Sequence, residues 1–190
     1  MISVVIPAEG NEQQVVATLA ALVPGAAAGV IREVVLVDRT GSDEIARVAD
    51  VAGCHFLKFE GSRAAAMAAG VKHVRGPWLM FLHAGAVLDH SWIDEAGQFI
   101  QSVAASGRPR AGVFRYARAP YEPLSVGHGM RLLSNFIAGP SADQGLLIAR
   151  EHYEQLGGYA STARRPEKKL LSKMGRAGRA MLRTRIFVAA

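Results

Sequence analysis

The feature that most constrains the fold is an alternation of short apolar runs with longer amphipathic segments through the first half of the chain. Four runs are short, apolar and rich in β-branched or aromatic residues, as buried strands are: Ile2–Pro7, Arg32–Val37, Cys54–Phe59 and Trp78–Leu82. Between these runs, apolar residues recur at the spacing of a helix over Glu12–Val23, Asp43–Ala52 and Ser62–His73. This order predicts an α/β fold with a mostly parallel central sheet and helices on both faces.

Local signals set the expected limits of these elements. Pro7 lacks a backbone donor and is predicted to end the first strand. Pro24 and Gly25 are predicted to end the first helix. Ser42 is a candidate N-cap for the second helix.

Ligands of open parallel sheets bind beyond the carboxyl ends of the strands. In this chain the corresponding loops are Pro7–Asn11, Asp38–Ser42, Glu60–Arg63 and His83–Ala86. All four are expected to converge on one crevice, which is therefore the predicted binding site.

The second half of the chain is less regular. Helices are predicted over Trp92–Ala105, around Met130–Phe136 and over Glu151–Leu156, and strands over Ala111–Tyr116 and Leu146–Ile148. A basic amphipathic helix is predicted from Pro166 to Arg183. The expected organisation is a domain over residues 1–163, with residues 164–190 as a basic helix or tail of the same domain.

Composition fits one folded domain: the chain has 190 residues, of which 50% are hydrophobic and 20% charged. The net charge of +6 is concentrated at the end, where the segment from Arg164 onward carries nine Lys or Arg and one acid. Cys54 is the only cysteine, which excludes an internal disulfide. The start shows no signal-peptide pattern, so a cytoplasmic location is expected, with a peripheral location at the inner face of the membrane as the alternative.

Four motifs occur in an order known from one enzyme family: ISVVIPAEGNE, REVVLVDRTGSD, RGPWLMFLHAGAVLD and DQGLLIAREHYEQLGGY. In these the chain resembles family 2 glycosyltransferases, and specifically a small bacterial subgroup whose fourth-strand motif reads Leu-His-Ala-Asp-Thr. The resemblance covers about residues 1–160. It implies a GT-A fold, which is Rossmann-like, and transfer of a sugar from a nucleotide diphosphate.

The resemblance also assigns roles to individual residues. It implies that Pro7 and Glu9 lie along the nucleoside, that Asp38 accepts a hydrogen bond from the base, and that Arg63 lies near the diphosphate or the sugar. Each has a structural alternative: Asp38 caps a turn, Glu9 is a solvated turn residue, and Arg63 forms a surface salt bridge. A further group is implied to form the loop facing donor sugar and acceptor: His83, Gly85, Asp143 and Gln144.

One departure from the family concerns the metal. The family holds Mg²⁺ or Mn²⁺ at an Asp-x-Asp-like site after the fourth strand, where the ion offsets diphosphate charge. Gly85 stands at the position of the acidic ligand, and neutral His83 is a poor substitute for hard oxygen ligands. Asp89 follows shortly after and is expected to cap the helix that starts near Trp92. No metal site is therefore predicted from these residues.

The other departure concerns the catalytic base. The family places an acidic pair after Gly-Gly-Tyr, and the likeliest alignment puts Pro166 and Glu167 over it. Glu167 is thus the candidate base, although neighbouring cations lower a carboxylate pKa and weaken it for that role. Its alternative is a solvated acid in the first turn of a helix.

Three functions remain open at this point. The first is binding of a nucleotide or nucleotide sugar with impaired or absent metal-dependent transfer. The second is active inverting transfer without a metal, in which Arg63, His83 or the tail cations stabilise the diphosphate. The third is a non-catalytic module whose basic tail binds a partner or an anionic membrane. Nucleic acid is not an expected partner, because aromatic residues do not interleave the basic ones.

Overall fold

The computed structural model describes residues 1–9, 11–117 and 144–188. The strands of this part of the chain form one eight-stranded sheet. They are β1 Ile2–Ala8, β2 Ile31–Asp38, β3 His55–Lys58, β4 Trp78–Phe81, β5 Ala86–Leu88, β6 Ala111–Tyr116, β7 Leu146–Ala149 and β8 Arg179–Val188. The helices are α1 Glu12–Ala27, α2 Asp43–Val51, α3 Arg63–Lys72, α4 Trp92–Ser106, α6 Arg150–Gln155 and α7 Pro166–Met174.

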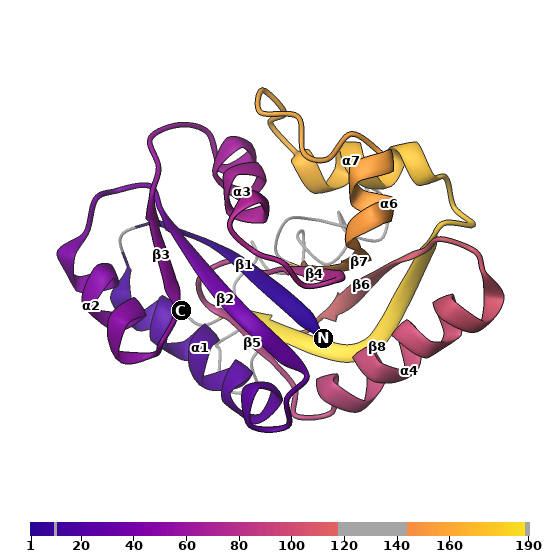
Figure 1. Ribbon diagram of the computed structural model, residues 1–190, viewed down its shortest axis with the longest axis horizontal. Helices are drawn as coiled ribbons and strands as arrows, with labels where there is room; N and C mark the ends of the chain where they lie inside the picture. The colour runs from indigo at the N-terminus through magenta and orange to yellow at the C-terminus, as the bar shows by residue number, and fades with distance from the viewer. Residues whose placement is uncertain (10, 118–143, 189–190) are drawn as a thin grey trace, which may run out of the picture.

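The sheet has the order β3-β2-β1-β4-β7-β6-β8-β5 and is mixed (Figure 1). The first four strands in this order are parallel, as the sequence predicts. β7 is antiparallel to both β4 and β6, β6 and β8 are parallel, and β5 is antiparallel to β8. The parallel half therefore carries the four strand-end loops, and the mixed half extends the sheet beside them.

Helices cover both faces of the sheet, because the strand side chains alternate between the faces. In β1, Val4 and Ile6 point into the core under α1, α2 and α4, whereas Val5 points into the core under α3, α6 and α7. Each helix buries an apolar stripe against the sheet, such as Leu170 and Leu171 of α7. No helix of the described residues is long and apolar enough to cross a membrane.

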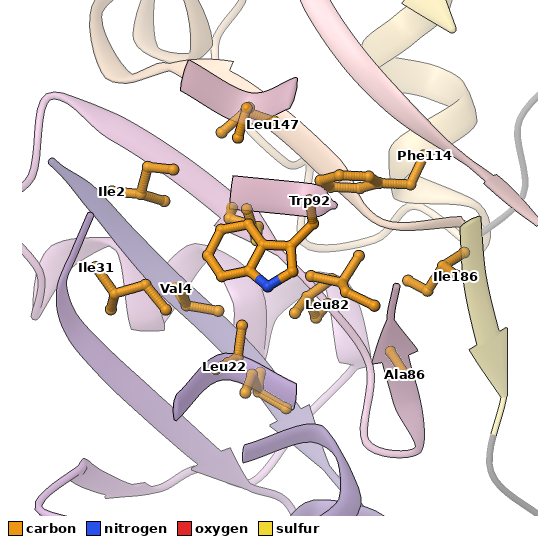
Figure 2. Close-up of a cluster of buried hydrophobic side chains, with 14 of the residues drawn as sticks. Ile2, Val4, Leu22, Ile31, Leu82, Ala86, Trp92, Phe114, Leu147 and Ile186 are labelled. Carbon is orange, nitrogen blue, oxygen red and sulfur yellow. The ribbon is translucent and has the colours of Figure 1, made fainter. Parts of the chain in front are cut away.

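Trp92 lies at the centre of the first core, between α1 and the sheet (Figure 2). Its indole nitrogen donates to the carbonyl of Ala21 at 3.2 Å, and its ring occupies the space that a Cβ at Gly25 would need. This contact accounts for one correction: α1 does not stop at Pro24 but runs to Ala27. Packing of Gly25 against the indole outweighs the helix-breaking preference of the proline.

The predicted end of the first strand is also wrong by one residue, because β1 continues through Pro7 to Ala8. The carbonyl of Ala8 bonds to Arg39 beside β2, whereas that of Val5 bonds to Leu82 beside β4. The backbone N–H and C=O groups of the odd-numbered β1 residues therefore point toward β4. The pairing of β4 with β1 stops at Val5. The missing N–H of Pro7 thus costs no ladder bond.

The predicted helix from Pro166 to Arg183 is wrong in its second half. α7 ends at Met174, Gly175 adopts a φ of +66°, and β8 begins at Arg179. β8 shows the two-residue period of a strand: Leu182, Thr184 and Ile186 are buried, and the residues between them are exposed. The basic end of the chain is therefore part of the sheet. The helix predicted around residues 130–136 lies outside the described residues.

Candidate functional site

The carboxyl ends of β1, β2, β3 and β4 lie at one edge of the sheet. The loops that follow them start at Glu9, Arg39, Phe59 and Leu82. Contacts between these loops, and from α7, define the candidate site.

Asp38 is buried, with 1% of its surface exposed, at the last position of β2. One carboxylate oxygen accepts hydrogen bonds from the backbone N–H (3.0 Å) and hydroxyl (2.8 Å) of Thr40, and the other accepts from the N–H of Ser42 (2.7 Å). Ser42 in turn caps α2, as predicted. The Asp38 carboxylate therefore holds the turn into α2. Its contact with a base stays a prediction.

Arg39 links three of the strand-end loops and was not singled out from the sequence. Its guanidinium forms an ion pair with Glu9 and donates from Nε to the carbonyl of Gly61 at 2.9 Å. The only sequence signal was a cation directly after Asp38 at a strand end. Glu9, predicted along the nucleoside, is thus the partner of this arginine, and Pro7 lies buried behind it in β1.

Arg63 and Glu167 are 104 residues apart in sequence and form an ion pair of 2.5 Å between Nη1 and Oε1. Their side chains are 24% and 8% exposed. Arg63 is the first residue of α3 and Glu167 the second of α7, so the contact joins the two helices on one face of the sheet (Figure 1). Ser62, the N-cap of α3, donates to the carbonyl of Ser161 at 2.5 Å and supports the same contact. The structure therefore brings together the arginine that was predicted to lie near the diphosphate and the glutamate that is the candidate base.

Tyr159 lies next to this ion pair. Its ring packs edge-on against Phe81 and Tyr153, and its backbone N–H donates to the Tyr153 hydroxyl at 3.0 Å. Burial, and then the charge of Glu167, raise the pKa of Tyr159 well above its usual range. The hydroxyl therefore stays neutral at physiological pH and supplies no second negative charge beside Glu167.

The loop after β4 is a tight turn, closed by a hydrogen bond from the N–H of Ala86 to the carbonyl of His83 (3.1 Å). Gly85 has a φ of +92°, and no non-glycine among the described residues has a positive φ, so the turn is of type II. The Gly85 N–H lies 2.9 Å from both the carbonyl of Gln14 and the hydroxyl of buried Thr18. Backbone geometry thus favours glycine here, and α1 anchors the loop.

The described residues do not fit a divalent metal. Gly85 supplies no carboxylate, and no group of three His, Cys, Asp or Glu side chains in the described part of the chain is arranged to hold an ion. The Asp89 carboxylate contacts His90 (2.7 Å) and the N–H of Ser91 (3.5 Å), at the start of α4. Asp89 was expected to cap α4, but the N-cap is Ser91 and no side chain caps the helix start, so this expectation is wrong. No reaction step can be assigned to a metal held by these residues.

The remaining predicted residues flank the turn. His83 is half-buried at its first position, and Gln144 is buried just before β7, the antiparallel neighbour of β4. Asp143 lies outside the described residues. One strand was missed here: Ala86, predicted as part of the turn, begins β5, which pairs with β8.

Comparison with known proteins places this fold. Among solved structures, residues 1–349 of Staphylococcus aureus TarS superpose with a TM-score of 0.71 at 13% identity, covering 99% of this chain and 60% of that one. A mannosyltransferase from Pyrobaculum calidifontis, in complex with GDP-Man and Mn²⁺, gives 0.69 at 15% identity, covering 99% and 56%. Glucosyl-3-phosphoglycerate synthase from Mycobacterium tuberculosis, in complex with Mn²⁺, UDP and glucosyl-3-phosphoglycerate, gives 0.69 at 14% identity, covering 100% and 71%.

These identities establish the fold alone, and the chain spans about 60% of the length of the first of these structures. No curated protein matches the chain significantly. The sequence profile of glycosyl transferase family 2 matches residues 3–123, which is more than half of the chain. The matched range runs from the second residue of β1 through β6 and contains all four strand-end loops. The chain therefore belongs to glycosyl transferase family 2 and has a GT-A fold.

Proposed function

We propose that the chain binds a nucleoside diphosphate or a nucleotide sugar at the carboxyl edge of β1 to β4, and that its metal-dependent sugar transfer is impaired or absent. The observation that carries the proposal is the contact between Arg63 and Glu167. It places a cation and a carboxylate from distant parts of the sequence at the edge where ligands of such sheets bind. Family membership and neighbours with UDP or GDP-Man in their sites support the same ligand class.

Two features support the loss of metal-dependent transfer. Gly85 leaves the turn after β4 without the acidic ligand that the family uses. This loop would therefore hold no metal ion to offset the negative charge of the leaving diphosphate. The Glu167 carboxylate is also engaged by the Arg63 guanidinium at 2.5 Å, so in this arrangement it faces a cation and not an acceptor hydroxyl.

The same ion pair favours a second candidate, active inverting transfer without a metal. The Arg63 guanidinium has five N–H donors, so a bound diphosphate could draw it away from Glu167. The arginine would then offset the diphosphate charge while the released carboxylate accepted the acceptor's proton. Arg39, which joins the loops after β1 and β3, would supply a second cation nearby.

A third candidate is a membrane-facing module, favoured by the exposed side of α7. Arg164, Arg165, Lys168 and Lys169 line a groove of about 420 Å³ there, while Glu167 faces inward. Each basic residue near an anionic surface contributes about 1 kcal/mol to binding. Salt-sensitive sedimentation with phosphatidylserine vesicles that is lost in an Arg165→Gln/Lys169→Gln variant would support this surface.

Calorimetric titration with uridine and guanosine diphosphates tests the main proposal. We expect Arg63→Gln to weaken binding at least about tenfold, as loss of a charged hydrogen bond does. Arg47→Gln is the matched control, because Arg47 is 74% exposed on α2 and its guanidinium pairs with Glu44, not with a residue of the strand-end loops. Unchanged affinity in Arg63→Gln, or an equal loss in both variants, would show that the diphosphate binds elsewhere.

A further inference from the structure

A cavity of about 520 Å³ lies at the opposite edge of the sheet from the candidate site. β6 and β8 begin and β7 ends at this edge, where β1 and β4 also begin. Three helices end around it, α4, α6 and α7 (Figure 1, right). α7 thus runs from the Arg63–Glu167 contact at its first turn to this cavity at its last.

The cavity is lined by cations from two segments. Arg108 and Arg110 come from the loop between α4 and β6, Lys173 comes from the last turn of α7, and no lining residue carries a carboxylate. One donor of each of two cations is used internally: Lys173 Nζ donates to the carbonyl of Leu156 (2.5 Å), and Arg110 Nη2 to that of Arg179 (3.4 Å). The remaining donors of these groups are available to a ligand.

Capping of the helix ends does not account for all of this charge. A helix C-terminus carries about half a negative charge, so three helix ends offset about 1.5 of the three positive charges. The cavity therefore carries an excess of positive charge, and one of its sides is open to solvent. An anion is the ligand that such a recess favours.

Two buried polar groups beside the cavity lack a hydrogen-bond partner in the arrangement that the structure shows. Both ring nitrogens of His152, on α6, are buried and have no hydrogen-bond partner among the described residues. The Nε of Arg110 is buried and likewise has no partner there. Buried donors and acceptors are nearly always satisfied, because an unmade hydrogen bond costs about 1–3 kcal/mol.

We propose that this cavity is a second binding site, for a small phosphorylated ligand. Arg108, Arg110 and Lys173 would contact the phosphate oxygens, and the His152 ring, which lines the cavity, would turn so that one of its nitrogens hydrogen-bonds the same group. The volume is in the range of small-molecule sites, and Leu156 and Met174 supply apolar walls for the rest of the ligand. The proposal does not depend on nucleotide binding at the other edge of the sheet.

Amide chemical shifts during titration with inorganic pyrophosphate distinguish the two edges. We expect saturable shifts at the amides of Leu156 and Gly178, which line the cavity, whether or not Thr40 and Ser42 at the other edge also respond. Arg108→Gln, an exposed change that the fold should tolerate, is expected to weaken the cavity response at least tenfold, and Arg110→Gln at least as much. Arg47→Gln should leave it unchanged. Shifts confined to Thr40 and Ser42, or an equal loss in Arg47→Gln, would overturn the proposal.

His152→Phe tests the ligand role of the imidazole, because it keeps a ring and removes the two nitrogens. If the nitrogens await a ligand, the variant should melt at a higher temperature without pyrophosphate and bind pyrophosphate several-fold more weakly. An unchanged pyrophosphate affinity would assign His152 to packing and remove it from the site. Should Arg108→Gln also keep wild-type affinity, the cavity would not be an anion site.

Discussion

At the residue scale, the ion pair between Arg63 and Glu167 controls what the candidate site can do. Both side chains are largely withdrawn from water, so each depends on the other for charge compensation. Sequence reasoning selected the two residues for separate roles, yet it had no means of showing that they touch. Under the proposed function, this single contact would tie nucleotide binding to the availability of the candidate base.

Glu167→Gln separates these two effects. We expect a loss of about 1–3 kcal/mol in unfolding free energy, because the half-buried guanidinium loses a charged partner. Binding of uridine diphosphate should become several-fold tighter, because Arg63 is no longer neutralised. Denaturant unfolding and calorimetry measure the two quantities, with exposed Glu151→Gln on α6 as the control. Weaker diphosphate binding in Glu167→Gln would mean that the carboxylate assists the ligand.

Gly85→Asp tests whether the turn after β4 faces the site. The positive φ of Gly85 should make any substitution there cost about 1–2 kcal/mol. Gly85→Asn carries the same strain without a carboxylate and is the matched control. We expect Mn²⁺ to raise the melting temperature of the Asp variant only. Identical responses of the two variants to Mn²⁺ would contradict the assignment of Gly85 to the family's metal position.

At the scale of elements, the parallel half of the sheet and strands β6 and β7 were predictable, whereas β5 and β8 were not. β1 and β4, and β2 from Val34 onward, are apolar runs between clear helices, which is how buried parallel strands appear in sequence. β3 was predicted to be buried as well, but it lies at the edge of the sheet and its ends are exposed. β8 was hidden because Met174, Ala177 and Met181 continue a helical spacing from α7. Its two-residue period includes Thr184, a polar residue buried against the sheet, which hydrophobicity alone does not detect.

Two neighbouring residues distinguish the strand from the helix. Met181 and Leu182 would both lie on the apolar face of the predicted helix, whereas in β8 they are 54% and 4% exposed. We expect Leu182→Ala to cost about 2–5 kcal/mol of unfolding free energy and Met181→Ala to cost little. Denaturant unfolding measures both. Similar losses would show that residues 179–188 do not form a strand.

The amino edge of the parallel strands is held by Glu33 of β2. Its carboxylate accepts hydrogen bonds from the Ser3 hydroxyl (2.6 Å) and from the N–H groups of Arg75 (2.6 Å) and Gly76 (3.1 Å). Burial raises the pKa of Glu33, but these hydrogen bonds and Arg32 outweigh it, so the pKa lies below the usual 4.5. A lowered folded-state pKa means that the stabilisation is complete above about pH 4.5 and is lost as pH falls through the folded value.

Glu33→Gln should therefore lower the unfolding free energy at pH 7 by about 1–3 kcal/mol, since charged hydrogen bonds are replaced by neutral ones. The difference from the unsubstituted protein should shrink as pH falls below 4.5. Unfolding curves between pH 3 and pH 7 check this. A difference that stays constant with pH would show that ionisation of Glu33 does not stabilise the fold.

At the scale of the whole molecule, charge is divided between two edges of one sheet. At the carboxyl edge, two cations are paired with acids, Arg39 with Glu9 and Arg63 with Glu167. The opposite edge gathers cations around a cavity lined without carboxylates. The proposed nucleotide site and the proposed phosphate site would thus lie at the two ends of α7.

Titration of the protein with uridine diphosphate, once with EDTA and once with Mn²⁺, tests the central claim most directly. If the site relies on Arg63 and not on an ion held after β4, the dissociation constant of uridine diphosphate should be the same with EDTA and with Mn²⁺, within about twofold. Binding that appears only with Mn²⁺ would show that a metal is held despite Gly85, and would contradict this account of the site.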